Sequence, residues 1–444
     1  MARKEELERL WLRTTDYLFN QRPAFERQGT HGYKPGLGTS IALAKLYKEP
    51  YRHYRTIHIA GTNGKGSTAH MLASCLQKCG YRVGLFTSPH MVDFRERIRV
   101  NGKKISRNFV IQWVADYKKN KQKMLDDIEP SFFELTSTMA FDYFAWRHVN
   151  VAVIETGLGG RLDSTNIITP DLSIITNIGL EHQQFLGDTL ADIASEKAGI
   201  IKHGQPVVIG HANGIVRMVF ERTAKRLYAD ITFAEDEPQV INAKHANGML
   251  QLNTRDHGIV NCDLTGDYQV ENVNTVLTAL NVLKHGKYRI KDQAVKEGLA
   301  HVAETTGLIG RWMKLGDKPL TICDSAHNVA GITQAMKQLT HESYDQLHMV
   351  MGFMADKDVD GILQLLPQKA TYYFTQAQTP RALSVKDLLP KAKKHGLKGS
   401  TYYNVSEALD AARQAAHPRD MIYIGGSMYV LAELFKAISN EDDE

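Results

Sequence analysis

A glycine-rich segment, Gly61-Thr62-Asn63-Gly64-Lys65-Gly66-Ser67, carries the clearest chemical signal of the chain. It follows the apolar run 57–60 and precedes a stretch of helical periodicity at 68–78. A strand that ends in such a loop and opens a helix turns several backbone N–H groups toward one point, and Lys65 adds a mobile positive charge there. We therefore predict that residues 61–67 bind a nucleoside triphosphate and that Lys65 acts on its phosphates.

The spacing of this segment departs from the general P-loop pattern. The glycine expected six positions before the lysine is missing, and Gly66 separates Lys65 from the hydroxyl residue Ser67. Glycine-rich turns between a strand and a helix also occur as purely structural turns in α/β proteins. The lysine, together with the strand–loop–helix context, favours nucleotide binding over that alternative.

Two carboxylates end apolar runs further along the chain. Glu155 closes the run 151–155; a carboxylate oxygen there suits Mg²⁺, although an acidic residue in this place could also cap a loop. Asp324 closes the run 320–324, and His327 follows three residues later. This pair fits general acid–base work or phosphate orientation, while the alternative is that Asp324 caps a helix starting near Asn328.

Six segments occur in order along residues 57–330. They are GTNGKGS at 61–67, TSPH at 87–90, ETGLGGRLDSTN at 155–166, LEHQQFLGDT at 180–189, SEKAGIIK at 195–202 and DSAHN at 324–328. Together they resemble the folylpolyglutamate synthase and dihydrofolate synthase family, a branch of the ATP-dependent Mur-type ligases. The chain departs from the family pattern at Val329, where a proline is usual, and at 34–38, which lacks the charged residues often found there.

The resemblance implies which residues hold ATP and metal. Besides the loop 61–67, the residues that correspond to ATP contacts are Asn272, Arg311 and Asp324. Those that correspond to ligands of two magnesium ions are Ser88, Glu155 and His182, and potassium is a further candidate ion. Taken alone, His182 would be interpreted as a hydrogen-bonded structural residue, because imidazole is an unusual ligand for magnesium.

The local sequence and the resemblance lead to different interpretations of Lys197. Its place in Ser195-Glu196-Lys197-Ala198 alone predicts an exposed lysine on a helix. The resemblance instead implies a carbamylated lysine, and a desolvated amine that loses its proton can react with carbon dioxide. With Lys65, Asp324 and His327, Lys197 completes the predicted catalytic set.

The resemblance also implies the substrates. A pterin would lie near Ser131, Asp163 and Ser164, with Gly36 and Leu37 as further neighbours. Arg311 stands at the predicted domain junction, so it would reach phosphates only when two domains close. The expected partners are small molecules, namely a pterin or folate, L-glutamate and ATP.

Composition excludes several classes of protein. Of 444 residues, 54 are basic and 49 acidic, and no long basic block suggests a nucleic-acid partner. No run of about 18 apolar residues predicts a membrane span, and the charged start lacks the apolar core of a signal peptide. We expect a cytoplasmic monomer. The four cysteines show no metal-binding spacing, so we expect neither a disulfide nor zinc.

The elements that must position these residues alternate between apolar strands and amphipathic helices. The strands are predicted at 56–60, 83–87, 151–155, 172–177 and 206–210, then at 320–324, 348–352, 371–375 and 421–425. This pattern predicts α/β architecture, a P-loop NTPase-like parallel sheet domain at 1–305 and a smaller Rossmann-like domain at 313–444. The segment 306–312 would link them, and a small antiparallel excursion is expected at 233–264, before a helix at 270–283.

These features together predict an ATP-dependent ligase. It would activate a carboxylate as an acyl phosphate and add L-glutamate to dihydropteroate, to (poly)glutamylated tetrahydrofolates, or to both, with both favoured. The alternatives are a monofunctional folylpolyglutamate synthase, a peptidoglycan Mur ligase, or a P-loop switch ATPase that needs no acceptor. A Mur ligase fits less well, because the TSPH and LGGRLDSTN segments resemble those of the folate enzymes. In addition, a sugar-nucleotide domain ahead of the P-loop would normally need more than 56 residues.

Overall fold

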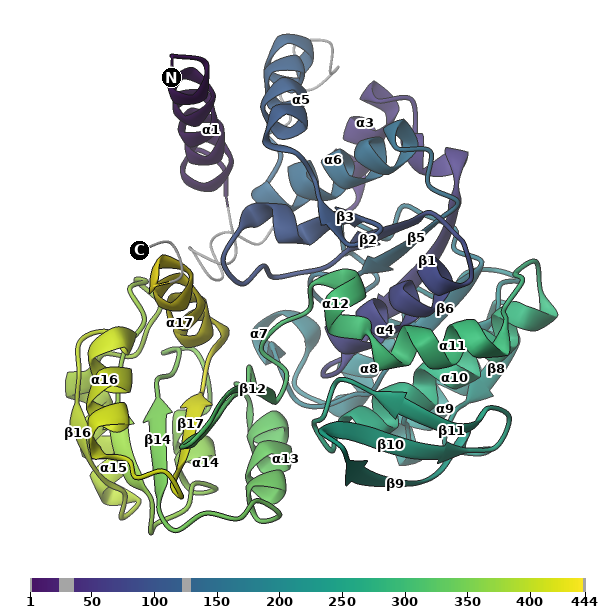
Figure 1. Cartoon of the computed structure of the whole chain (residues 1–444). Coiled ribbons are helices and arrows are strands. Elements are labelled where there is room, and N and C mark those ends of the chain that lie inside the picture. The colour runs from purple at the N-terminus through teal and green to yellow at the C-terminus, as the bar shows by residue number, and fades with distance from the viewer. Residues whose placement is uncertain (1, 24–35, 122–128, 442–444) are drawn as a thin grey trace.

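The computed structural model describes residues 2–23, 36–121 and 129–441 of the chain. Its amino-terminal part is built on a large mixed sheet and its carboxyl-terminal part on a smaller one, and the two parts lie side by side (Figure 1). The predicted α/β class is therefore confirmed. Among the described residues, no helix is both long and apolar enough to cross a bilayer.

The large sheet has eight strands in the order β4-β3-β2-β5-β1-β6-β7-β8. Its strands are β1 (Arg55–Ala60), β2 (Val83–Phe86), β3 (Ile98–Val100), β4 (Lys103–Lys104), β5 (Val151–Glu155), β6 (Leu172–Ile175), β7 (Val207–Ile209) and β8 (Ile231–Phe233). The six strands from β2 to β8 in this order pair in parallel, while β3 and β4 are antiparallel. The five predicted strands are present, and the short strands β3, β4 and β8 were missed because their runs are too brief to show a pattern.

Helices cover both faces of this sheet because alternate residues of each strand point to opposite sides. One face packs on α4 (Lys65–Lys78), α10 (Gln269–His285), α11 (Asp292–Ala300) and α12 (Val302–Thr306). The apolar clusters on the other face include residues of α3 (Gly38–Leu46), α5 (Arg107–Asn120), α6 (Phe132–Trp146), α8 (Leu190–Ala198) and α9 (Gly214–Arg226). The first helix, α1 (Ala2–Asn20), packs against α5 rather than on the sheet (Figure 1). Two buried faces explain why the central strands are almost wholly apolar in sequence.

The predicted antiparallel excursion is confirmed as a three-stranded sheet in the order β11-β10-β9. Its strands are β9 (Val240–Ala246), β10 (Met249–Thr254) and β11 (Gly258–Cys262). Inward residues of β10 and β11 join the core below α10 and α11. This small sheet precedes α10, whose first turn lies beside the glycine-rich segment 61–67.

The carboxyl-terminal sheet has six strands in the order β12-β13-β17-β14-β15-β16. They are β12 (Met313–Asp317), β13 (Leu320–Cys323), β14 (Leu347–Met351), β15 (Thr371–Phe374), β16 (Lys398–Thr401) and β17 (Met421–Gly425), flanked by α13 (Val329–Leu339), α14 (Val359–Leu363), α15 (Val385–Lys394), α16 (Val405–Ala415) and α17 (Met428–Glu441). Only β12 pairs antiparallel. Asp324 thus follows the second strand of this sheet, not the first as predicted, because β12 is a half-exposed edge strand without an apolar run.

The connection between the two parts runs from the end of α12 at Thr306 to the start of β12 at Met313, and residues 307–312 form neither helix nor strand. The predicted domain limits around this segment stay a prediction. Gln338 of α13 bridges the parts, since it accepts from Asp267 N at 2.7 Å and donates to Thr265 O at 3.0 Å. A buried glutamine that satisfies two backbone groups fixes how α13 docks.

The four cysteines are free thiols in the structure. Cys75, Cys262 and Cys323 are buried, and Cys79 is half-buried. A buried thiol packs as a small apolar side chain of the core.

Candidate active site

The nucleotide loop, residues 61–67, connects the end of β1 to the start of α4. Gly64 is the N-cap of α4 with φ of 85°, and Gly61 has φ of 146°. A Cβ atom would lie 1.9 Å from Thr176 Oγ1 if added at Gly61, and 2.2 Å from Asn272 Oδ1 if added at Gly64. Glycine is therefore required at both positions by backbone conformation and by space.

The helix after the loop begins at Lys65, three residues before its predicted start. Because its N-cap is a glycine, no side chain caps the first-turn N–H groups. Lys65 Nζ donates to the carbonyl oxygens of Gly61 at 2.9 Å and Thr62 at 3.0 Å. The positive end of the helix and the lysine ammonium thus lie at the same loop, an arrangement that suits a phosphate chain.

Asn272 lies against this loop, as predicted for an ATP contact. Gln269, in the same helix α10, links the two: its Nε2 donates to Ser67 Oγ at 3.2 Å, and its Oε1 accepts from Asn272 Nδ2 at 2.8 Å. The structure thus brings Asn272 and the loop together, although Asn272 is about 200 residues away in sequence. Its contact with a nucleotide stays a prediction.

Glu155 ends β5 and is buried beside the nucleotide loop. The Ser88 N–H donates to Glu155 Oε2 at 3.1 Å. A Cβ atom added at Gly66 would lie 3.9 Å from the Glu155 carboxylate oxygens and 3.6 Å from Arg311 Nη2, so carboxylate and guanidinium both approach the loop. Burial raises the pKa of Glu155 to about 7, although the charge of Lys65 opposes this rise. A nearby cation stabilises the charged form of a buried carboxylate, so Glu155 and the Ser88 hydroxyl fit a magnesium site.

Two histidines face each other across the site, one from each part of the chain. Burial lowers the pKa of His182, which lies just before α7 (Gln183–Leu186), and that of His327 to about 4. Both rings are therefore neutral near pH 7. His327 Nδ1 lies 3.0 Å from the Ser325 carbonyl oxygen, so Nδ1 carries the proton and donates it, and Nε2 keeps a lone pair.

Lys197 is 1% exposed, so its interpretation as an exposed lysine is wrong. Its Nζ donates to Gly61 O at 2.7 Å and to Glu181 Oε1 at 3.0 Å. Burial lowers the pKa of Lys197 to about 8. Burial acts to raise the pKa of Glu181, but the charges of Lys197 and Lys65 and the hydrogen bond from Lys197 together outweigh it, and the pKa of Glu181 falls to about 2. Lys197 lies four residues after Ile193, on the same buried face of α8. This spacing is the sequence signal from which the burial of Lys197 could have been predicted.

Asp324 is buried and bound by three donors. It accepts from Tyr268 Oη at 2.7 Å, Trp312 N at 2.7 Å and Ala326 N at 2.8 Å, and burial raises its pKa. The alternative that Asp324 caps the next helix is wrong, because Asn328 is the N-cap of α13. Asp324 instead ties the end of β13 to the connecting segment and to the residue before α10.

The DSAHN segment also touches the nucleotide loop directly. Asn328 Nδ2 donates to Asn63 Oδ1 at 3.0 Å across the boundary between the two parts. Arg311 donates to Gly310 O at 3.1 Å and also to the hydroxyl of Ser325. The two motifs, 265 residues apart, therefore meet at one place, with Arg311 between them.

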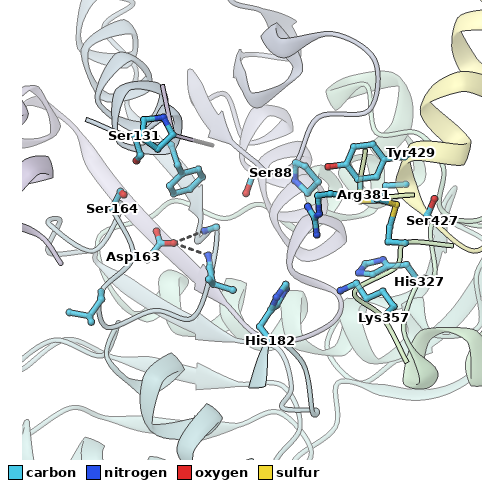
Figure 2. A pocket seen from close by; sticks show the side chains of 18 residues that line it. Ser88, Ser131, Asp163, Ser164, His182, His327, Lys357, Arg381, Ser427 and Tyr429 are labelled. Atoms are coloured by element: carbon cyan, nitrogen blue, oxygen red, sulfur yellow. Dashed lines mark hydrogen bonds between the residues drawn. The ribbon is translucent and has the colours of Figure 1, made fainter. Parts of the chain in front are cut away.

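A cavity of about 200 Å³ opens beside this meeting point. Figure 2 shows Ser131, Asp163 and Ser164 on one side of it and His327, Lys357, Arg381 and Tyr429 on the other. Ser88 and His182 also line the cavity. The structure thus collects the predicted metal and pterin residues of the large sheet and faces them with residues of the carboxyl-terminal sheet.

Several lining residues were missed by sequence reasoning. Lys357 follows β14, Arg381 follows β15, and Ser427 and Tyr429 follow β17. The carboxyl ends of parallel strands gather ligand sites, so the same rule that selected Glu155 could have selected these residues. Burial lowers the pKa of Lys357.

Asp163 and Ser131 are engaged in local structure at the cavity wall. Asp163 Oδ2 accepts from Gly157 N at 2.8 Å and Leu158 N at 2.9 Å (Figure 2). Its Oδ1 accepts from Thr165 N at 3.0 Å. Burial raises the pKa of Asp163. Ser131 is the N-cap of α6 in a reciprocal pair with Glu134. Their pterin contacts stay predictions, as does that of Ser164.

Gly36 and Leu37 lie at the start of α3, and the Leu37 carbonyl accepts from Ile41 N at 2.8 Å. Within the described ranges, neither is among the residues that line the cavity. Residues 34 and 35 of the same predicted pterin segment lie outside the described residues. The predicted role of Gly36 and Leu37 therefore has no support from this geometry and stays a prediction.

Comparison with known proteins places this geometry in a family. The model of the Mur ligase middle domain matches residues 59–280, and that of the Mur ligase glutamate ligase domain matches residues 310–428. The dihydrofolate synthase/folylpolyglutamate synthase of Bacillus subtilis is 33% identical over 422 residues, which are 92% of this chain and 96% of that protein.

Two further comparisons agree. A probable bifunctional folylpolyglutamate synthase/dihydropteroate synthase of Haloferax volcanii is 33% identical over 90% of this chain, which spans about half (48%) of that longer protein. The structure of E. coli FolC in complex with DHPP and ADP superposes with a TM-score of 0.83 and 26% identity, covering 98% of both chains. The chain therefore belongs to the dihydrofolate synthase/folylpolyglutamate synthase family of Mur-type ligases, and it is an ATP-dependent ligase.

Proposed function

We propose that this enzyme adds L-glutamate both to dihydropteroate and to tetrahydrofolates that already carry glutamate, with release of ADP and phosphate. The observation that carries the proposal is the contact of Asn328 with Asn63, which sets the DSAHN segment against the nucleotide loop beside one shared cavity. A relative that covers nearly the same length bears both activities in its name. An acid bound in the cavity would therefore lie between an ATP site and an amine site.

The chemistry follows from the weakness of a carboxylate as an acylating agent. A carboxylate oxygen of the pterin substrate attacks the γ-phosphorus, the bond to the β-phosphate oxygen breaks, and ADP leaves. The amine of glutamate then attacks the acyl carbon, and phosphate leaves. Lys65 and the first-turn N–H groups of α4 stabilise negative charge on the phosphates. The bare Nε2 of His327 can accept a proton from the attacking amine.

The residues that would hold two magnesium ions are Ser88, Glu155 and His182, all of which lie at this site. When bound, magnesium neutralises charge on the triphosphate. Asp324 holds the segment that carries Arg311 and His327, so we propose that it acts by orienting those groups. Potassium remains a further candidate ion.

Lys357 and Arg381 give the cavity two cationic side chains on the carboxyl-terminal side. Both carboxylates of glutamate must be held while its amine stays free to react. Charged donors recognise carboxylates strongly in a partly buried site. We propose that these two residues hold the incoming glutamate, opposite the wall that takes the pterin.

The product assay tests the proposed function. With glutamate and Mg-ATP, we expect mass spectrometry to show a glutamylated product from dihydropteroate and from tetrahydrofolate, and ADP release to depend on the acceptor. A product from tetrahydrofolate alone would indicate the monofunctional alternative. Full-rate ADP release without any acceptor would contradict ligase activity and favour a switch ATPase.

Replacing Lys65 or Glu155 by alanine should lower kcat by about 10²- to 10³-fold, because each removes charge stabilisation at the transferring phosphoryl group. Lys78→Ala, at the exposed end of the same helix as Lys65, is the matched control and should keep the wild-type rate. Circular dichroism should show that all three variants fold. Near-normal turnover of Lys65→Ala or Glu155→Ala would mean that the site is misplaced.

Lys357→Met should raise the KM for glutamate about 10- to 100-fold while the KM for ATP changes little, because a charged contact to the substrate is lost. Lys369→Met, an exposed lysine of the same part of the chain, is the control. Steady-state kinetics with each substrate varied in turn measure the effect. An unchanged glutamate KM would remove Lys357 from the glutamate site.

Lys197 is proposed to be carbamylated: its neutral amine attacks the carbon of CO₂, an N–C bond forms and one proton is released. With a pKa of about 8, the neutral fraction grows as pH rises through 8, so the carbamate should grow from pH 7 to pH 9. ¹³C NMR with labelled bicarbonate should show a carbamate signal that Lys197→Arg lacks. Identical spectra for the two proteins would contradict the modification.

A further inference from the structure

His58 is a buried polar residue that the proposed chemistry does not use. It lies in the middle of β1, within the apolar run 57–60, and is 0% exposed. Its ring Nε2 is 2.8 Å from Thr165 Oγ1. Burying a histidine in the centre of a sheet lowers stability unless its polar atoms form hydrogen bonds, so the presence of a histidine at this position needs an explanation.

The hydrogen bonds around Thr165 fix the direction of this contact. Asp163 accepts three backbone N–H groups, from Gly157, Leu158 and Thr165, so its carboxylate is an acceptor. The Thr165 hydroxyl therefore donates its one proton to Asp163 Oδ1. The same hydroxyl oxygen must then accept the N–H of His58 Nε2.

The other ring nitrogen agrees with this assignment. His58 Nδ1 is buried and has no hydrogen-bond partner among the described residues, as expected for a bare nitrogen. Burial, helped by the charge of Lys202, lowers the pKa of His58 to about 3, so the ring stays neutral. His58 is thus a fixed single donor toward Thr165 rather than a titrating group.

This chain of bonds ends at the wall of the cavity. The loop from Gly157 to Ser164 supplies five lining residues, and its first two N–H groups are held by Asp163. His58 stands three residues before Gly61 on the strand that leads into the nucleotide loop. The series His58, Thr165, Asp163 therefore connects the rigid centre of the sheet to the substrate wall.

We infer that His58 is a positioning residue, which acts through Thr165 and Asp163 to hold the 157–164 loop in the shape that receives the pterin end of the substrate. The inference rests on the proposed function for the identity of that substrate. Both carboxylate oxygens of Asp163 accept hydrogen bonds from its own loop, so Asp163 fixes the shape of the cavity wall. The position of Asp163 depends in turn on the Thr165 hydroxyl, which His58 holds in place. A His58 that only filled space would be replaceable by any side chain of equal volume.

Two matched pairs of variants separate these roles. His58→Met keeps the volume and removes the donor, whereas His58→Gln keeps an N–H near the position of Nε2. Thr165→Val removes the hydroxyl, and Thr165→Ser keeps it. We expect His58→Met and Thr165→Val to raise the KM for dihydropteroate about tenfold, the cost of one buried hydrogen bond, with the KM values for ATP and glutamate within about twofold. The variants His58→Gln and Thr165→Ser should have a dihydropteroate KM close to that of the wild type.

His348→Met is the control for loss of a buried histidine. His348 is bonded to Tyr373 Oη at 3.0 Å in the carboxyl-terminal sheet, remote in sequence from the loop. We expect this variant to lower the melting temperature without changing the dihydropteroate KM. Measured beside it, the melting temperature of each His58 and Thr165 variant separates loss of stability from loss of positioning.

An equal dihydropteroate KM for Thr165→Val and Thr165→Ser would overturn the inference, as would equal values for His58→Met and His58→Gln. If His58→Met does not fold, the Thr165 pair decides, since that residue lies outside the strand. Wild-type enzyme is assayed first. Absence of any glutamate ligation by the wild type would refute the proposed function, whereas active wild type with unaffected variants would refute only the role of His58.

Discussion

The hydrogen bond between Asn63 and Asn328 joins the nucleotide loop to the carboxyl-terminal sheet, and the rest of the site depends on that junction. An acyl phosphate survives only where water is kept out, so the groups that make it and the groups that consume it must enclose one space. Gln338 and Asp324 fix the same arrangement from either side. The cavity lies where these contacts bring together the carboxyl ends of the parallel strands of the two sheets.

Burial gives the ionisable groups of the site their chemical character. Lys197 and Glu155 are buried and His327 is half-buried in the cavity wall, and desolvation disfavours the charged form of each. The results differ because the partners differ: Lys197 has Glu181, Glu155 faces Lys65 and Arg311, and His327 donates to a carbonyl. Desolvation, modified by these partners, therefore gives a lysine that can lose its proton, a carboxylate that a cation would stabilise, and a neutral imidazole.

Several polar residues near the cavity stabilise the structure of its wall. Asp163 holds the backbone of its own loop, Ser131 caps α6, and Asp324 holds the connecting segment. Such residues occur in a family motif for a structural reason as well as a chemical one. The His58 series extends this support into the centre of the sheet, where a neutral donor is fixed by packing on both faces.

Local sequence patterns were enough to predict the α/β class, the strands around Ile57, Val83, Val151 and Leu172, and the nucleotide loop, because apolar periodicity and the need for glycine are local properties. They placed Glu155 at a strand end for the same reason. The folded structure alone reveals that Lys197 is buried, that Asn328 and not Asp324 caps α13, and that Lys357 and Arg381 lie across the cavity from Ser131, Asp163 and Ser164. The burial of Lys197 and the position of Lys357 and Arg381 depend on contacts between segments far apart in sequence, and the spacing signals for these residues do not say which surfaces meet. The cap of α13 is decided by the local backbone geometry at Asn328.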